Sequence, residues 1–101
     1  MGDELHLTGF RVKVRPHSIK FSVVLYIRSS EAKNIPFSDF YIVSVQGKTV
    51  PAVAHRVNKN CLFLSFPSKK KCVKELKKEL WKKLGEDLEA VIYPLPKAEP
   101  S

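Results

Sequence analysis

Residues 40–66 have the sequence FYIVSVQGKTVPAVAHRVNKNCLFLSF, in which three runs of alternating apolar residues are separated by two short polar turns. Gly47-Lys48 suits a two-residue type II′ turn, because glycine at the first central position tolerates positive φ. In the second turn, Asn58-Lys59-Asn60, Asn60 is a favourable left-handed position. The stretch therefore predicts a three-stranded antiparallel meander.

The two faces of this meander follow from the pairing that the turns impose. The expected pairs are Val45 with Val50, Val43 with Ala52, Tyr41 with Ala54, Ala54 with Leu64 and Ala52 with Phe66. One face is then uniformly apolar: Tyr41, Val43, Val45, Val50, Ala52, Ala54, Leu62, Leu64 and Phe66. The other face mixes serines with Phe40, Ile42, Val53, His55, Val57 and Phe63. We expect a helix on the first face, and for the second face a packed layer in preference to an exposed binding surface.

A second hairpin is expected upstream of the meander. Residues 5–14 form its first strand, and the apolar phase changes at Gly9, which predicts a β-bulge there. Residues 18–28 form the return strand after a turn at Arg15-Pro16-His17-Ser18. If Val14 pairs with Ile19, the apolar side chains near the turn share one face, and Lys13 faces Lys20 on the other.

One amphipathic helix is expected downstream. Ser68 is a natural N-cap, and the apolar stripe consists of Val73, Leu76, Leu80, Leu84 and Leu88. Gly85 is placed to end or kink this helix. Residues 89–93 then read as a last strand, which we expect to run parallel to the strand before the helix through a right-handed crossover. In the connection 29–39, residues 30–33 can form one helical turn.

These elements predict an α+β fold. It consists of a mostly antiparallel curved sheet or small open β-barrel of about six strands, with one amphipathic helix near the C-terminus and the order β-β-β-β-β-α-β. We expect residues 1–96 to form a single globular domain and residues 97–101 a disordered tail.

Composition limits the functional classes. The chain has 101 residues and a formal net charge of +8, which favours an acidic partner. It has no apolar run of the roughly 20 residues that a membrane-spanning helix needs, so no membrane partner is expected. The N-terminal segment MGDELHLTGF lacks the basic and apolar regions of a signal peptide, which predicts a cytoplasmic protein. Cys61 and Cys72 have no partners at zinc spacing, so we expect no metal and no cofactor.

The sequence offers no convincing set of catalytic residues. The histidines His6, His17 and His55 fall in three separate elements, and no carboxylate is positioned to orient any of them. We therefore expect a non-enzymatic protein.

The basic residues predict the function. Strands that carry cations and aromatic side chains suit RNA or single-stranded DNA, because bases stack and cations follow phosphates. The candidate nucleic-acid-binding residues are Arg11, Lys13, Arg15, His17, Lys20, Tyr26 and Arg28 in the first hairpin, and Lys69, Lys70 and Lys71 at the helix start. Phosphate contacts imply low sequence specificity. The later lysines of the helix are interpreted as a solvated face, because glutamates are interleaved with them.

The alternative is a protein–protein interaction module or homodimeric adaptor whose positive charge serves only solubility. Its interface would be the half-apolar face around Phe40, Ile42, Val53 and Phe63.

Overall fold

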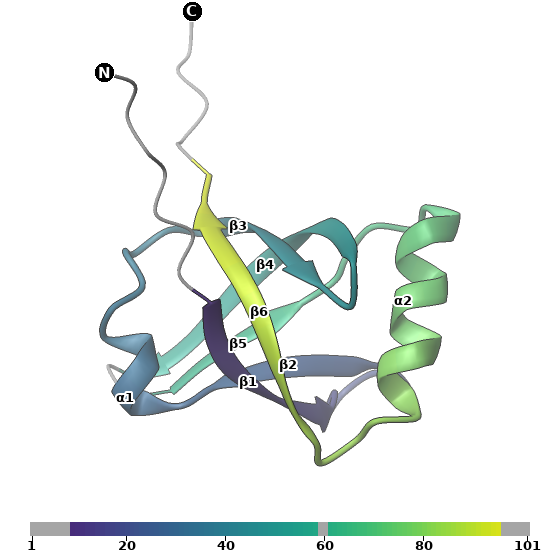
Figure 1. Cartoon of the computed structure of the whole chain (residues 1–101), viewed down its shortest axis with the longest axis horizontal. Helices are drawn as coiled ribbons and strands as arrows, with labels where there is room; N and C mark the ends of the chain where they lie inside the picture. Colours follow the sequence, from purple (N-terminus) through teal and green to yellow (C-terminus); the bar gives the residue numbers. More distant parts are fainter. Residues whose placement is uncertain (1–8, 59–60, 96–101) are drawn as a thin grey trace, which may run out of the picture.

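Six strands form a closed barrel with the strand order β1-β2-β5-β4-β3-β6, in a computed structural model that describes residues 9–58 and 61–95 (Figure 1). The elements in chain order are β1 (Gly9–Pro16), β2 (Val23–Ile27), α1 (Ser29–Ala32), β3 (Phe40–Val45), β4 (Lys48–Asn58), β5 (Cys61–Ser65), α2 (Lys71–Trp81) and β6 (Asp87–Pro94). Figure 1 shows the two helices at opposite ends of the barrel. The predicted tail, residues 97–101, lies outside the described residues.

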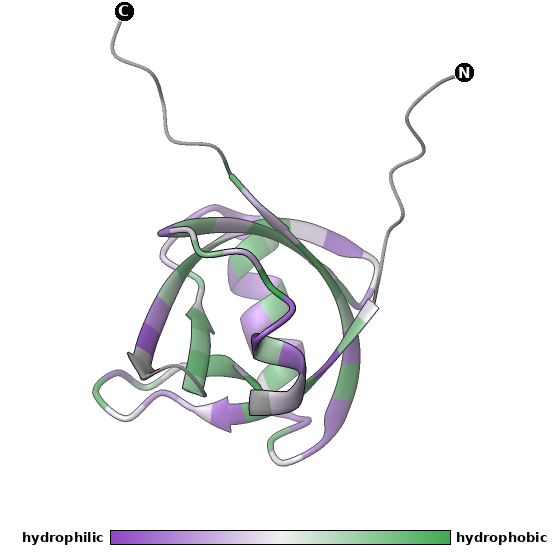
Figure 2. Cartoon of the chain, turned by 90° about the vertical axis from the view of Figure 1, so that its left-hand side faces the viewer, coloured by the Kyte–Doolittle hydropathy of each residue, from purple (hydrophilic) through white to green (hydrophobic). Residues whose placement is uncertain are grey.

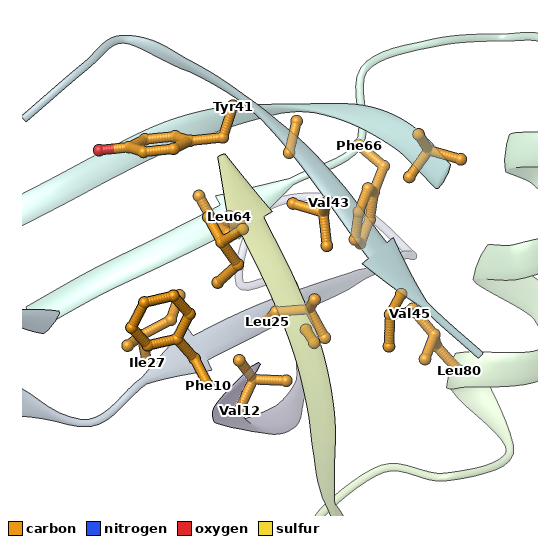
Figure 3. Close-up of a cluster of buried hydrophobic side chains, with 14 of the residues drawn as sticks. Phe10, Val12, Leu25, Ile27, Tyr41, Val43, Val45, Leu64, Phe66 and Leu80 are labelled. Atoms are coloured by element: carbon orange, nitrogen blue, oxygen red, sulfur yellow. The ribbon is translucent and has the colours of Figure 1, made fainter. Parts of the chain in front are cut away.

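The core fills the barrel, because every strand turns alternate side chains inward. Figure 3 shows such side chains converging from β1, β2, β3 and β5, with Leu80 of α2 among them. Tyr41 is fully buried, and its hydroxyl donates a hydrogen bond to the carbonyl of Pro36. The alternation is visible along the strands in Figure 2, where hydrophobic and hydrophilic residues succeed one another.

Helix α2 buries only the first half of the predicted apolar stripe. Val73, Leu76 and Leu80 are buried, as expected for its core-facing side. The helix ends at Trp81, and Gly85 follows with a φ of 85°. Leu84 is 37% exposed in the turn between, and Leu88 belongs to β6. No helix in the described part of the chain is both long and apolar enough to span a membrane.

The start of α2 also differs from the expectation. Lys70 is the N-cap residue and makes no side-chain capping hydrogen bond. Ser68 lies two residues further upstream, and its hydroxyl accepts a hydrogen bond from the Lys70 amide at 3.2 Å. The serine thus stabilises the approach to the helix and does not cap it.

The first turn of the meander is Gln46-Gly47, not Gly47-Lys48. Both residues have positive φ, 53° and 76°, which is the type I′ geometry that matches strand twist. Val43 therefore pairs with Val50, two residues from the predicted register. A shift of two keeps every side chain on its face, so the predicted inner face is confirmed.

The second turn confirms one predicted pair, because Ala54 lies opposite Leu64. The conformation predicted for Asn60 falls outside the described residues.

The second face of the meander is the outside of the barrel, so the expectation of a packed layer is wrong. A closed barrel has one interior, and each strand can turn only one set of side chains into it. Phe40 is 54% exposed, and Ile42, Val53 and Phe63 are half-buried.

The register predicted for the first hairpin is wrong. Val14 pairs with Leu25, not with Ile19, and Lys13 lies opposite Tyr26, not Lys20. Residues 17–22 form a loop that connects β1 and β2, here called the β1–β2 loop. Neighbouring strands in a closed barrel must be staggered, and this stagger leaves the loop outside the sheet. Ile19 and Phe21, which the predicted register placed on one face with Val12 and Val14, are 86% and 92% exposed.

The last strand closes the barrel. β6 runs antiparallel to both β1 and β3, so the predicted parallel pairing with the strand before the helix is wrong. The order is ββαβββαβ, because α1 forms within the connection where one helical turn was considered. β1 pairs with β6 from Gly9 onward, and the residues upstream that suggested a bulge there lie outside the described part of the chain.

Candidate functional site

A cleft rimmed by lysines lies where the β1–β2 loop meets α2. It has a volume of about 710 Å³ and is lined by Lys20, Phe21, Ser22, Lys74, Lys77, Lys78, Trp81 and Lys82. We call it the lysine cleft. In Figure 1 the start of β2 reaches the end of the barrel that α2 covers, so two segments far apart in the sequence build one surface.

The helical wall of the lysine cleft is a second stripe on α2. Lys74, Lys77, Lys78 and Trp81 follow the spacing i, i+3, i+4 and i+7, which places them on one side of the helix, and the C-cap residue Lys82 continues this side. Neither glutamate of α2 is among the residues that line the cleft. One of them, Glu75, reaches Lys48 on β4 at 3.9 Å. The side of α2 that faces the cleft is therefore cationic and aromatic.

Two aromatic rings form the apolar part of the lysine cleft. The ring centroids of Phe21 and Trp81 are 4.7 Å apart, with an interplanar angle of 38°. Trp81 also packs against the core, whereas Phe21 is almost fully exposed. Backbone hydrogen bonds from His17 to the Ser22 carbonyl, 2.8 Å, and from Ser22 to the Lys20 carbonyl, 2.7 Å, hold the loop that presents Phe21.

Positive charge in the lysine cleft is crowded. The pKa of Lys77 is lowered, first because burial desolvates its ammonium group and then because Lys20 and Lys74 repel it. No acidic side chain is found among the described residues that line the cleft. An anion bound in the cleft would offset the repulsion between these lysines.

The predicted basic face of the first hairpin is opposed by carboxylates. β6 brings Asp87 opposite Lys13 and Glu89 opposite Arg11. Arg28 forms an ion pair with Asp87 at 3.0 Å. The stretch that carries these cations has no acidic residue of its own, but a strand distant in the sequence supplies two.

The other predicted site residues are divided among separate places. Lys20 lines the lysine cleft. Arg15 and His17 line a second cleft on the outside of the barrel, under the β1–β2 loop, and Tyr26 lies beside it with Arg15 6.0 Å from its ring centroid. Lys69, Lys70 and Lys71 are exposed before and at the start of α2 and do not line either cleft.

Sequence reasoning missed most of the lysine cleft: Phe21, Ser22, Lys74, Lys77, Lys78, Trp81 and Lys82. The α2 stripe carried a usable signal, because a tryptophan stands among lysines at helical spacing. Phe21 carried no such signal, since the alternation of residues 18–28 placed it on the apolar face of the first hairpin.

Metal and redox sites are not suggested by the described residues. Within residues 9–58 and 61–95, no group of three or more His, Cys, Asp or Glu side chains could hold a metal ion. Cys61 and Cys72 are free thiols.

No protein-family model, curated protein or solved structure matches this chain. The lysine cleft is therefore interpreted from its own chemistry: two aromatic faces for a planar group and five ammonium groups for anions.

Proposed function

We propose that this protein binds single-stranded nucleic acid, RNA or DNA, in the lysine cleft and does not act as an enzyme. The observation that carries the proposal is the contact between exposed Phe21 and half-buried Trp81 among five lysines. A single strand offers unpaired bases that stack on aromatic rings and phosphates that pair with lysines. Its two chemical parts match the two kinds of side chain in the cleft.

The electrostatics support the same ligand. Each phosphate neutralised by lysine releases condensed counterions, and this release drives binding without regard to sequence. The repulsion around Lys77 adds to that driving force, because an anion near Lys20 and Lys74 relieves it. Low sequence specificity and a cytoplasmic location, both expected from the sequence, are part of the proposal.

A pair of substitutions distinguishes the lysine cleft from the first hairpin. We expect Lys78→Ala to weaken binding of fluorescent oligonucleotides of every sequence, and Lys13→Ala to have little effect, because Asp87 already lies opposite Lys13. Anisotropy titrations at several salt concentrations measure both effects. If about four lysines contact phosphates, wild-type log Kd should change with log salt by a slope of about 3, and Lys78→Ala should remove about 0.7 of it. A larger loss with Lys13→Ala than with Lys78→Ala would move the site to the hairpin.

Lys77→Gln should change binding and stability in opposite directions. The lowered pKa means that the folded chain holds the Lys77 proton less tightly than the unfolded chain, so the charged form costs stability below both pKa values. We expect Lys77→Gln to weaken oligonucleotide binding and to leave the unfolding free energy unchanged or raised by up to about 0.5 kcal/mol. The stability that the charged Lys77 costs the wild type should be regained as pH rises through its lowered pKa toward 10.5, the ordinary value for lysine.

Thermal unfolding and anisotropy titration of the same sample measure the two effects, and Lys33→Gln, outside the cleft, is the matched control. A variant that loses stability and binding together would show that Lys77 supports the fold and not the ligand.

The competing interpretation is a protein interface on the outside of the barrel. Phe40 and Val53 are cross-strand neighbours there, with Ile42 and Phe63 on the same surface. Measuring the mass of the protein in solution at two salt concentrations, with and without oligonucleotide, tests this interpretation. A dimer that does not bind the oligonucleotide would favour the protein interface. Binding to anionic lipid vesicles without binding to oligonucleotide would also contradict the proposed function.

A further inference from the structure

The second cleft lies on the outside of the barrel, where the β1–β2 loop folds over β2. We call it the histidine cleft; it has a volume of about 430 Å³, and His17 and His55 both line it. Val24, which also lines it, is only 7% exposed although it does not belong to the core cluster. The loop therefore shields part of the outer face of the barrel and creates a concave surface there.

His17 has a defined role in this loop. Its Nδ1 atom accepts hydrogen bonds from the amides of Ile19 at 3.1 Å and Lys20 at 3.3 Å. A neutral imidazole that accepts at Nδ1 carries its proton on Nε2. His17 thus offers a hydrogen-bond donor at the cleft, and the same contacts hold the loop that carries Phe21 into the lysine cleft.

Cationic and aromatic side chains meet at the histidine cleft. In the strand register Phe63 lies opposite Tyr26 on one side and His55 on the other. The Phe63 and Tyr26 ring centroids are 5.2 Å apart, and the Arg15 guanidinium carbon is 6.0 Å from the Tyr26 centroid. His55 Nε2 is 3.0 Å from the Ser65 hydroxyl.

The charge of Arg15 is available to a ligand. The ion pairs found within residues 9–58 and 61–95 are Arg28–Asp87 and Lys48–Glu75, and neither involves Arg15. The lining of the histidine cleft includes no acidic side chain among the described residues. An anion at Arg15 and the His17 donor would therefore meet no repulsion from the cleft wall.

We propose that the histidine cleft binds one nucleotide unit, with its phosphate at Arg15 and His17 and its base against Phe63. The volume falls in the range of about 300–1,000 Å³ that small-molecule sites occupy. The chemistry is a planar ring joined to a phosphate, and it has two sources: a free mononucleotide, or a nucleotide within a strand that also occupies the lysine cleft. The second source, a nucleotide within a nucleic-acid strand, rests on the proposed function. One such strand would reach both clefts, because the β1–β2 loop lies between them and contributes side chains to both.

Two substitutions with matched controls test this inference. Arg15→Gln removes the phosphate contact, and Arg11→Gln, on the same strand and face but outside the cleft, is its control. Phe63→Leu removes the ring while keeping an apolar side chain, and Phe40→Leu is the control elsewhere on the barrel exterior. Circular dichroism verifies that each variant is folded. Titration calorimetry then measures the affinity of the wild type and of each variant for AMP, UMP and oligonucleotides of increasing length.

We expect Arg15→Gln to weaken binding about tenfold, the loss typical of one charge-assisted hydrogen bond, with Phe63→Leu also weakened and both controls unchanged. If this holds for AMP or UMP, the ligand is a free nucleotide. If it holds only for longer oligonucleotides, the ligand is part of a strand. Either result supports the inference.

If Arg15→Gln and Phe63→Leu both bind mononucleotides and oligonucleotides with wild-type affinity, the inference is overturned. If oligonucleotide binding then still depends on Lys78, the proposed function stands without the histidine cleft. If wild-type protein binds mononucleotides through Arg15 but no oligonucleotide, the proposed function fails and the inference stands.

Discussion

Leu80→Ala should lower the free energy of unfolding by about 2–5 kcal/mol, the cost of truncating a fully buried leucine. Leu80 is 0% exposed and belongs to the core cluster, where α2 closes one end of the barrel. The truncation removes apolar contacts and leaves a cavity that a closed barrel can collapse around only in part. Chemical denaturation followed by tryptophan fluorescence measures the change.

Leu84→Ala is the matched control, because both leucines belong to one apolar stripe in the sequence. Leu84 lies past the end of α2 and is 37% exposed. Its truncation should cost less than about 1 kcal/mol, as for other surface changes. Equal losses at the two positions would mean that α2 continues to Leu84, and would contradict the helix end at Trp81.

Phe21→Ala should weaken oligonucleotide binding about 5- to 150-fold, which corresponds to roughly 1–3 kcal/mol for one base–aromatic stacking contact. Phe21 is 92% exposed and contacts the Trp81 ring, so its truncation removes a stacking surface without opening the core. The melting temperature should stay within a few degrees of wild type, roughly the shift that a change of 0.5 kcal/mol causes. Anisotropy titration and thermal unfolding of the same sample separate the two effects.

Phe37→Ala is the control for aromatic exposure. Phe37 is 77% exposed in the α1–β3 connection, outside the lysine cleft, where Arg56 lies 4.3 Å from its ring centroid. Its truncation should leave oligonucleotide binding unchanged. Equal losses for Phe21→Ala and Phe37→Ala would indicate nonspecific hydrophobic adsorption and would contradict stacking in the lysine cleft.

The position of the candidate site could not be predicted from the pattern of charges in the sequence alone. The first hairpin carries Arg11 and Lys13 in a stretch without acidic residues, and this pattern predicted its outer face as the site. β6 then sets Asp87 and Glu89 opposite these cations. Cross-strand neighbours in a barrel come from distant segments, so a local charge count cannot reveal which cations lie opposite carboxylates.

Phe21 illustrates the same limit for apolar residues. It continues the alternation of Val23, Leu25 and Ile27, and those three are buried as the pattern predicts. Phe21 itself is exposed, because the stagger between β1 and β2 ends their pairing at Pro16 and Val23. Alternation indicates which side chains share a face, but it does not indicate where a strand stops.

Local rules were sufficient for the inward-facing side of the meander strands β3, β4 and β5 and for the buried side of α2. Side-chain direction has a period of two in a strand, so a pairing shift of two residues, as between Val43 and Val50, leaves the inner face unchanged. Barrel closure, the antiparallel position of β6 and the meeting of the β1–β2 loop with α2 depended on the tertiary structure. These features follow from strand stagger and long-range pairing, which depend on all six strands at once and not on any single segment.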